Sequence, residues 1–141
     1  MDAEKPHAAL DLDWLSASWP RFGPWNLDAR HANTALVAQS YRSMGINRFI
    51  VAGVIESAAD AEGLKVALGA ERLAVCRLHA PLEVVEQRLR RREDDESLGW
   101  FLARAATLDA QFEDDGLDDL VLDATRPVRE VAQELASLLD W

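Results

Sequence analysis

Acidic side chains follow three apolar segments of the chain. Asp11 and Asp13 end the first segment, Glu56 comes shortly after the second, and Asp123 ends the last. Two carboxylates that are two residues apart on a strand point to the same side, so Asp11 and Asp13 could share a magnesium ion or a substrate hydroxyl. The alternative is that one of them caps the turn that follows. The spacing alone leaves both interpretations open.

One dense basic cluster, Arg88–Arg92, stands out in an otherwise acidic sequence. Planar guanidinium groups bind phosphate through paired hydrogen bonds, which makes this segment a candidate clamp for a phosphorylated ligand. The segment could also be the solvated face of a helix, because Glu86 lies four residues before Arg90, a favourable helical pairing.

The candidate residues fall at the ends of predicted strands. Four short apolar segments predict strands over residues 8–13, 48–54, 72–79 and 119–123. Helical spacing predicts five helices, for which Asp28, Ser57 and Thr125 are N-cap candidates, in the order β-α-β-α-β-α-α-β-α. We therefore predict an α/β fold with a mostly parallel sheet and helices on both of its faces. Ligands of such sheets bind beyond the carboxyl ends of the strands.

The length, charge and cysteine content of the chain limit the classes of function that it can have. The 141 residues suit a single domain, and 25 acidic against 15 basic residues, a net charge of −10, argue against binding to nucleic acid or to an anionic membrane. A single cysteine, Cys76, excludes a disulfide framework within the chain and favours a cytoplasmic location. No apolar segment approaches the ~20 residues of a membrane span, and the N-terminus lacks the pattern of a signal peptide.

Three tryptophans, Trp14, Trp19 and Trp25, crowd a proline-containing loop after the first predicted strand. Their rings could floor a partly apolar substrate pocket or wrap the edge of the sheet. The three histidines are scattered without the spacing of metal ligands, which is typical of ordinary surface or strand residues.

Taken in order, several segments carry a family likeness. They are ALDLDWL at 9–15, the helix over 33–41 with Gly45, RFIVAGVIE at 48–56, CRLHAPLEVV at 76–85, RLRRR at 88–92 and DLVLDAT at 119–125. In order and spacing the chain resembles the P-loop kinase-like proteins, the group that contains adenylylsulfate kinase, gluconate kinase and chloramphenicol phosphotransferase-like enzymes. The resemblance covers nearly all of the chain from residue 7 onward. It implies a three-layer P-loop-NTPase-like fold and ATP-dependent transfer of phosphate to the hydroxyl of a small molecule.

The resemblance also implies roles for residues of this chain. Asp11 and Asp13 would serve the acceptor hydroxyl and the magnesium shell, with Asp11 as the magnesium ligand. Arg88 and Arg92, on a helical lid, would contact the transferring phosphate. Residues that would bind the acceptor substrate are Trp14, Arg30, Asn33 and Glu56. Residues that would bind the nucleotide are Asp123, Thr125 and Arg126.

The chain departs from this family in one respect. It contains no G-x-x-x-x-G-K-[ST] motif, and neither of its lysines, Lys5 and Lys65, is followed by Ser or Thr. That loop supplies backbone N–H groups, a lysine and the magnesium-binding hydroxyl. The chain therefore resembles such a kinase without its first β-loop-α unit. Loss of a strand from inside the sheet would expose strand edges, from which we predict a homodimer or an exchanged oligomer.

Three interpretations of function follow. The first is a small-molecule kinase that uses ATP and Mg²⁺ and is inactive as this chain alone, unless the natural protein is longer or another chain donates the loop. The second is a non-catalytic kinase-like scaffold that binds a protein partner or a small ligand. The third is a misplaced start codon, which an upstream in-frame G-x-x-x-x-G-K-[ST] would establish.

Overall fold

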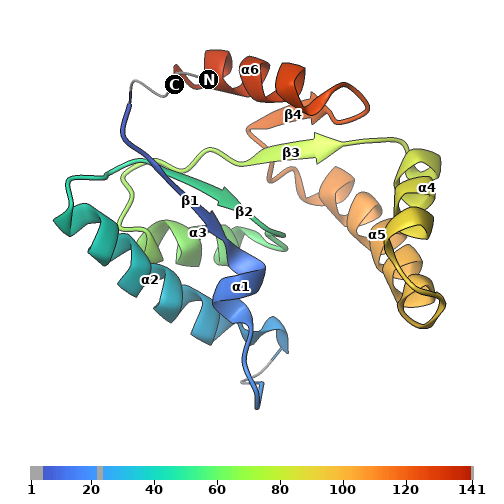
Figure 1. Cartoon of the computed structure of the whole chain (residues 1–141), viewed down its shortest axis with the longest axis horizontal. Coiled ribbons are helices and arrows are strands. Elements are labelled where there is room, and N and C mark those ends of the chain that lie inside the picture. The colour runs from blue at the N-terminus through green and yellow to red at the C-terminus, as the bar shows by residue number, and fades with distance from the viewer. Residues whose placement is uncertain (1–4, 22–23, 141) are drawn as a thin grey trace. The chain divides into compact units, whose positions relative to one another are not determined.

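The computed structural model describes residues 5–21 and 24–140, and the chain divides into two compact units, Met1–Leu73 and Ala74–Trp141, called unit 1 and unit 2 below. The described residues form six α-helices, one short 3-10 helix, η1 (Pro24–Asn26), and two parallel two-stranded sheets (Figure 1). The α/β class predicted from the sequence is confirmed. A three-layer sheet fold and a single domain over residues 1–141 stay predictions. Within the described residues, no helix is long and apolar enough to cross a membrane.

In unit 1, strand β1 (Ala8–Asp11) pairs in parallel with β2 (Phe49–Ala52), and helices α2 (Leu27–Ser43) and α3 (Ala58–Ala67) follow the two strands. One face of the sheet contributes Leu10, Phe49 and Val51 to the core. The buried residues of this core are Leu10, Leu12, Ala38, Leu64 and Leu68. The residues on the other face of this sheet are exposed, although helices were expected on both faces.

The first strand is shorter than predicted because a helix begins inside the predicted range. Helix α1 (Leu12–Ser16) follows β1 directly, and Leu12 is buried against Gly53. A Cβ at Gly53, whose φ is +155°, would lie 2.7 Å from the Cβ of Leu12, so only glycine allows this close packing. Asp13 consequently lies on a helix and not on a strand beside Asp11. The expectation that their side chains point the same way along a strand is wrong.

One helix start of unit 1 differs between sequence and structure, and another agrees. The residue before α2 is Asn26, in the left-handed conformation, and Asp28 lies in the first turn instead of capping the helix. Ser57 caps α3 as predicted, and its hydroxyl accepts a hydrogen bond from the backbone N–H of Asp60 at 3.1 Å. Gly45, with a φ of +85°, follows α2 and ends the helix in the left-handed conformation that glycine adopts readily.

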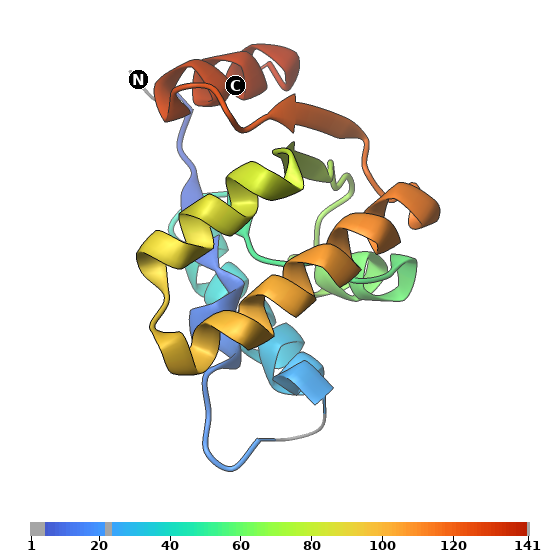
Figure 2. The ribbon, with the colours of Figure 1, turned by 90° about the vertical axis from the view of Figure 1, so that its right-hand side faces the viewer.

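In unit 2, strand β3 (Cys76–His79) pairs in parallel with β4 (Leu120–Asp123). Helices α4 (Leu82–Arg92) and α5 (Asp95–Asp115) lie side by side (Figures 1 and 2), and α6 (Val128–Leu138) packs on β4. The third strand begins later than the predicted residue 72. The Asp119 carboxylate accepts a hydrogen bond from Val75 N at 2.8 Å, and this side chain takes up the backbone donor next to the strand start.

Arg77 connects β3 to α5 inside unit 2. Its guanidinium donates a hydrogen bond to Glu113 at 2.9 Å, and its Nε lies 2.8 Å from Asp118 Oδ2. Burial disfavours the charge on Arg77, but the Glu113 hydrogen bond and the Asp118 carboxylate outweigh burial and raise its pKa. The arginine therefore fixes α5 against the sheet.

Candidate functional site

The carboxyl ends of β3 and β4 border two hollows in unit 2. A hollow of about 380 Å³ is lined by His79, Pro81, Val121, Leu122, Asp123 and Thr125. A second hollow, of about 300 Å³, is lined by Leu78, Ala80, Val85, Arg88, Leu89, Arg92 and Ala124. Both include residues of the loop 123–125 that leaves β4. This is the end of a parallel sheet at which ligands bind in α/β proteins.

The loop after β4 is held by its own side chains. Asp123 Oδ1 accepts hydrogen bonds from Thr125 N at 2.8 Å and from Thr125 Oγ1 at 2.6 Å. These two bonds, the hydroxyl bond foremost, lower the pKa of Asp123. Thr125 was predicted to cap the last helix, and this is wrong: its hydroxyl is engaged by Asp123, and α6 begins after Pro127. Asp123 and Thr125, predicted to bind the nucleotide, do line the larger hollow.

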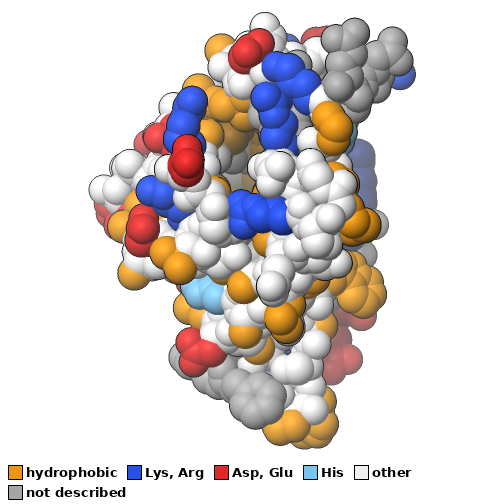
Figure 3. All heavy atoms as spheres, turned by 90° about the vertical axis from the view of Figure 1, so that its left-hand side faces the viewer, with side chains coloured by type: hydrophobic (Ala, Val, Ile, Leu, Met, Phe, Trp, Pro, Cys, Tyr) orange, Lys and Arg blue, Asp and Glu red, His pale blue; other side chains and the backbone are white. Residues whose placement is uncertain are grey.

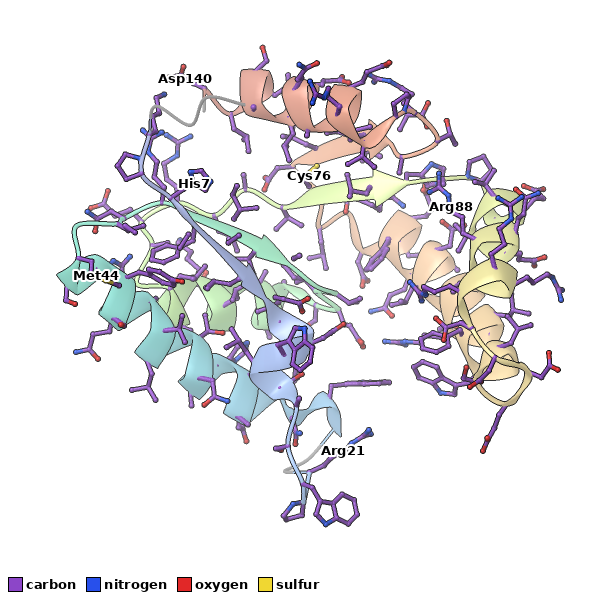
Figure 4. All side chains as sticks on the ribbon, viewed as in Figure 1. His7, Arg21, Met44, Cys76, Arg88 and Asp140 are labelled. Carbon is purple, nitrogen blue, oxygen red and sulfur yellow. The ribbon has the colours of Figure 1, made fainter. Side chains whose placement is uncertain are left out.

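Two predicted arginines line the smaller hollow. Arg88 Nη2 donates a hydrogen bond to the carbonyl of Ala124 at 2.8 Å, which joins α4 to the loop after β4. Figure 4 shows Arg88 of α4 close to the carboxyl end of β3. Arg92 lies 5.6 Å from the ring centroid of Phe101 and pairs with Glu93. A guanidinium has five N–H donors, so the Ala124 bond leaves Arg88 further donors for an anionic ligand.

Arg126 lies apart from this arrangement although it immediately follows the loop. It forms ion pairs with Glu130, at 3.7 Å, and with Glu134, both on α6. The Glu134 hydrogen bond is the main cause of a raised pKa of Arg126. Arg126 lines neither hollow. Of the five residues predicted in unit 2, Asp123 and Thr125 therefore line one hollow and Arg88 and Arg92 line the other, whereas Arg126 pairs with the last helix.

The acidic pair of unit 1 forms a cap. Asp11 Oδ1 accepts a hydrogen bond from Asp13 N at 2.9 Å, and Asp11 is thereby the N-cap of α1. This is the second of the two interpretations that the sequence left open. Within residues 5–21 and 24–140, no three His, Cys, Asp or Glu side chains form a group able to hold a metal ion. Magnesium ligation by Asp11 stays a prediction.

Arg30, predicted to bind substrate, lies in a buried polar cluster. Its side chain is 8% exposed, contacts the Asp60 carboxylate through Nη2, and donates to the Val54 carbonyl at 3.2 Å. Asp60 also lies 3.1 Å from His31 Nε2 and accepts a hydrogen bond from the backbone N–H of Glu56 at 3.3 Å. Burial alone would raise the pKa of Asp60, but the hydrogen bond and charge of Arg30 outweigh it and lower the pKa.

The sequence contained a signal for Asp60 that the predictions missed. Ser57 and Asp60 have the S-x-x-D spacing of a capping box, in which the acidic side chain returns to a backbone N–H near the helix start. Here the carboxylate reaches the N–H of Glu56. The partner Arg30 could not be inferred, because it depends on how α2 packs on α3.

Two of the three tryptophans of the loop after β1, Trp14 and Trp19, are largely exposed. The Trp14 side chain is 80% exposed and that of Trp19 is 92% exposed, and neither tryptophan lines a hollow described above. The buried amide of Asn26 anchors the loop by donating hydrogen bonds to Ser16 O at 2.8 Å and to Ser18 Oγ at 2.9 Å. Asn33, a predicted substrate-binding residue, donates to Leu15 O at 2.7 Å from α2. Asn26 and Asn33 thus hold α1 and the loop in place.

Comparison with known proteins finds no family model, no curated protein and no solved structure that matches this chain. The candidate site therefore rests on the geometry of the chain itself. Of the predicted residues, Arg88 and Arg92 are basic side chains that line a hollow at a strand end.

Proposed function

We propose that this chain is a kinase-like nucleotide-binding protein whose unit 2 binds a nucleoside phosphate such as ATP. Arg88 and Arg92 would contact the phosphates, and the loop 123–125 would border the rest of the ligand. The observation that carries the proposal is the 2.8 Å hydrogen bond from Arg88 to Ala124, which places the basic helix beside the loop at the carboxyl ends of β3 and β4. Arginine forks at such a position suit a polyphosphate.

The proposed role of this chain is binding and not phosphoryl transfer on its own. Transfer depends almost entirely on positioning and charge neutralisation, and the chain has no G-x-x-x-x-G-K-[ST] motif to supply them. Mg²⁺ usually binds through one or two carboxylates together with phosphate oxygens and water. The described residues form no protein-only metal group, so Mg²⁺ would enter with the phosphates of ATP.

The test is thermal unfolding of the full chain with and without millimolar Mg-ATP. A ligand that binds only the native state stabilises it by RT ln(1 + [L]/Kd), about 2.7 kcal/mol at a hundredfold excess over Kd. The double variant Arg88→Gln/Arg92→Gln should lose most of the shift. The control Arg90→Gln/Arg91→Gln removes the same charge from the same helix at two exposed positions that line neither hollow, and it should keep the shift.

Mg-ADP and adenosine, which have fewer phosphates than ATP or none, test which part of the ligand the chain binds. If the arginines hold phosphates, the shift should fall from ATP to ADP and be smallest for adenosine. Equal loss in both double variants would indicate a general charge effect and contradict the assigned site.

The second candidate function is a non-catalytic scaffold for a protein partner, favoured by the missing phosphate-loop motif. A chain that folds cooperatively but shows no shift with any nucleotide would support this candidate over the first.

A further inference from the structure

The larger hollow of unit 2 is lined by a histidine that was not among the predicted site residues. His79 is the last residue of β3 and pairs in register with Asp123, the last residue of β4, so both side chains lie on the same face of the sheet. Leu78, which lines the smaller hollow, precedes His79 on the strand, and its side chain points to the opposite face. The larger hollow is therefore a candidate site for a ligand of its own.

The polar atoms of the larger hollow are suited to accept hydrogen bonds. Both hydrogen bonds from Thr125 end on Asp123 Oδ1, and within residues 5–21 and 24–140 no hydrogen bond reaches Asp123 Oδ2. The same bonds lower the pKa of Asp123, so its carboxylate is ionised at neutral pH. His79 Nε2 lies 3.8 Å from Asp109 Oδ1 on α5, and this carboxylate favours a proton on Nε2. Nδ1 of the neutral ring is then a further acceptor.

The charge at this hollow is negative. Asp109 and Asp123 outnumber His79 even when its ring is protonated, and the described residues that line the hollow include no lysine or arginine. Two arginines act electrostatically on these carboxylates, Arg77 on Asp109 and Arg126 on Asp123. Each arginine is already paired with two other carboxylates, which are those of Glu113 and Asp118 for Arg77 and of Glu130 and Glu134 for Arg126. The hollow therefore suits a ligand with N–H donors and a positive charge.

The rest of the hollow is apolar. Pro81, Val121 and Leu122 line it beside the acceptors, and its volume of about 380 Å³ is that of a small-molecule site. On the face of the molecule in Figure 3, by contrast, hydrophobic side chains are scattered among charged ones. Among the described residues, no three His, Cys, Asp or Glu side chains are grouped to hold a metal ion. An organic cation with an apolar part therefore fits this hollow better than a metal ion does.

We propose that the larger hollow binds a protonated primary amine that carries a small apolar group. The ammonium group donates hydrogen bonds to Asp123 Oδ2 and His79 Nδ1, and the apolar group contacts Pro81 and Val121. Asp109 is a positioning residue, because it holds the ring of His79 with Nδ1 free for the ligand. The proposal does not rest on nucleotide binding at the smaller hollow.

The test is a titration of the full chain with benzylamine at pH 7, followed through the imidazole ring protons of His79 by NMR. His79→Gln assigns the resonances, and those of His7 and His31, which line neither hollow, serve as internal references. We expect a saturable shift of the His79 resonances. Benzyl alcohol has a similar size but no charge, and it should bind at least about tenfold more weakly, because charge-assisted hydrogen bonds are the stronger ones.

Two asparagine variants separate the site from a general effect of charge. Asp123→Asn replaces the free carboxylate oxygen and should weaken benzylamine binding about tenfold. The control Asp114→Asn makes the same charge change at an exposed position of α5 that lines neither hollow, and it should bind as the wild type does. Asp109→Asn tests the positioning role: the ¹⁵N chemical shifts of the His79 ring should lose the preference for the tautomer protonated at Nε2.

Several outcomes would overturn the proposal. They are the absence of a saturable shift, equal affinity for benzylamine and benzyl alcohol, and equal losses in Asp123→Asn and Asp114→Asn. Loss of benzylamine binding in Arg88→Gln/Arg92→Gln would place the amine in the smaller hollow and contradict the assignment. If Asp123→Asn does not fold, the wild type decides: nuclear Overhauser effects between benzylamine and the Val121 methyl groups support the site, and a saturable shift without them contradicts it.

Discussion

Replacing Asp60 with asparagine removes the negative charge from the buried cluster of unit 1 while keeping the shape of the side chain. Arg30 stays in place with an 8% exposed side chain and loses the carboxylate that neutralises it. His31 and the backbone N–H of Glu56 lose the same charge-assisted partner. We therefore expect Asp60→Asn to lower the free energy of unfolding strongly.

The expected magnitude follows from the burial of both partners. Removing one member of a buried ion pair costs about 3–5 kcal/mol, because the other charge is left uncompensated. Asparagine retains one acceptor oxygen, which places the expected loss at the lower end, about 3 kcal/mol. Domains of this size are stable by only about 5–15 kcal/mol, so the loss is large.

The assay is urea unfolding at pH 7 followed by circular dichroism, with hydrogen exchange of α3 peptides as the local readout. The matched control is Glu62→Gln, which makes the same charge change on α3, where the side chain is 67% exposed and lies 4.0 Å from Lys65. An exposed pair of this kind contributes under about 1 kcal/mol, so this variant should unfold nearly as the wild type does.

The pKa of Asp60 determines how the effect of Asp60→Asn on stability changes with pH. The pKa of Asp60 is lower in the folded state than in the unfolded state. The ionised Asp60 carboxylate therefore stabilises the fold fully above the unfolded-state pKa, and this stabilisation is lost as the pH falls through the folded-state pKa. The difference between wild type and Asp60→Asn should shrink in acid. Equal losses for Asp60→Asn and Glu62→Gln at pH 7, or a difference that grows in acid, would refute the reasoning.

Three further predictions concern the local backbone and helix starts. Gly53→Ala should destabilise the chain by about 1–3 kcal/mol through overpacking, whereas Gly99→Ala, inside α5 with open space around it, should stabilise it by about 0.5–1 kcal/mol in the same urea assay. Ser57→Ala should cost about 1 kcal/mol by removing the cap of α3, and a value near zero would contradict that role. Hydrogen bonds from Ser97 lower the pKa of Asp94, so its stabilisation is present at neutral pH and lost in acid, and Asp94→Asn should flatten an acid titration of stability.

The order of elements was predictable from local patterns. Apolar segments and helix signals gave the α/β alternation, and the pairing within each sheet is parallel as expected. The position of Asp13 was not predictable, because the chain turns into a helix where Leu12 packs against Gly53, a contact between segments far apart in the sequence. Strand length here depends on tertiary packing and not on local apolarity.

The same distinction applies to the candidate site. Arg88 and Asp123 were identified from residue type and from their place after or at strand ends, which is local information. The ion pair of Arg126 with Glu130 has the i, i+4 spacing that could have been read from the sequence, whereas the pair with Glu134 does not. The burial of Arg30 required knowledge of its partner Asp60 on another helix. Local sequence therefore identified one of the three predicted caps, Ser57, whereas the use of an arginine for structure or for ligand depends on packing.

The exposed tryptophan loop has a consequence for spectroscopy. Indole emission depends on whether the ring is surrounded by solvent or by protein, and Trp14 and Trp19 are solvated in the native state. The fluorescence of these two of the chain's five tryptophans should already resemble that of a denatured chain, so unfolding should change their contribution to the emission little. A ligand or partner that covers the loop should produce a blue shift instead. Trp14 and Trp19 therefore report optically on contacts made at this loop and respond little to loss of the fold.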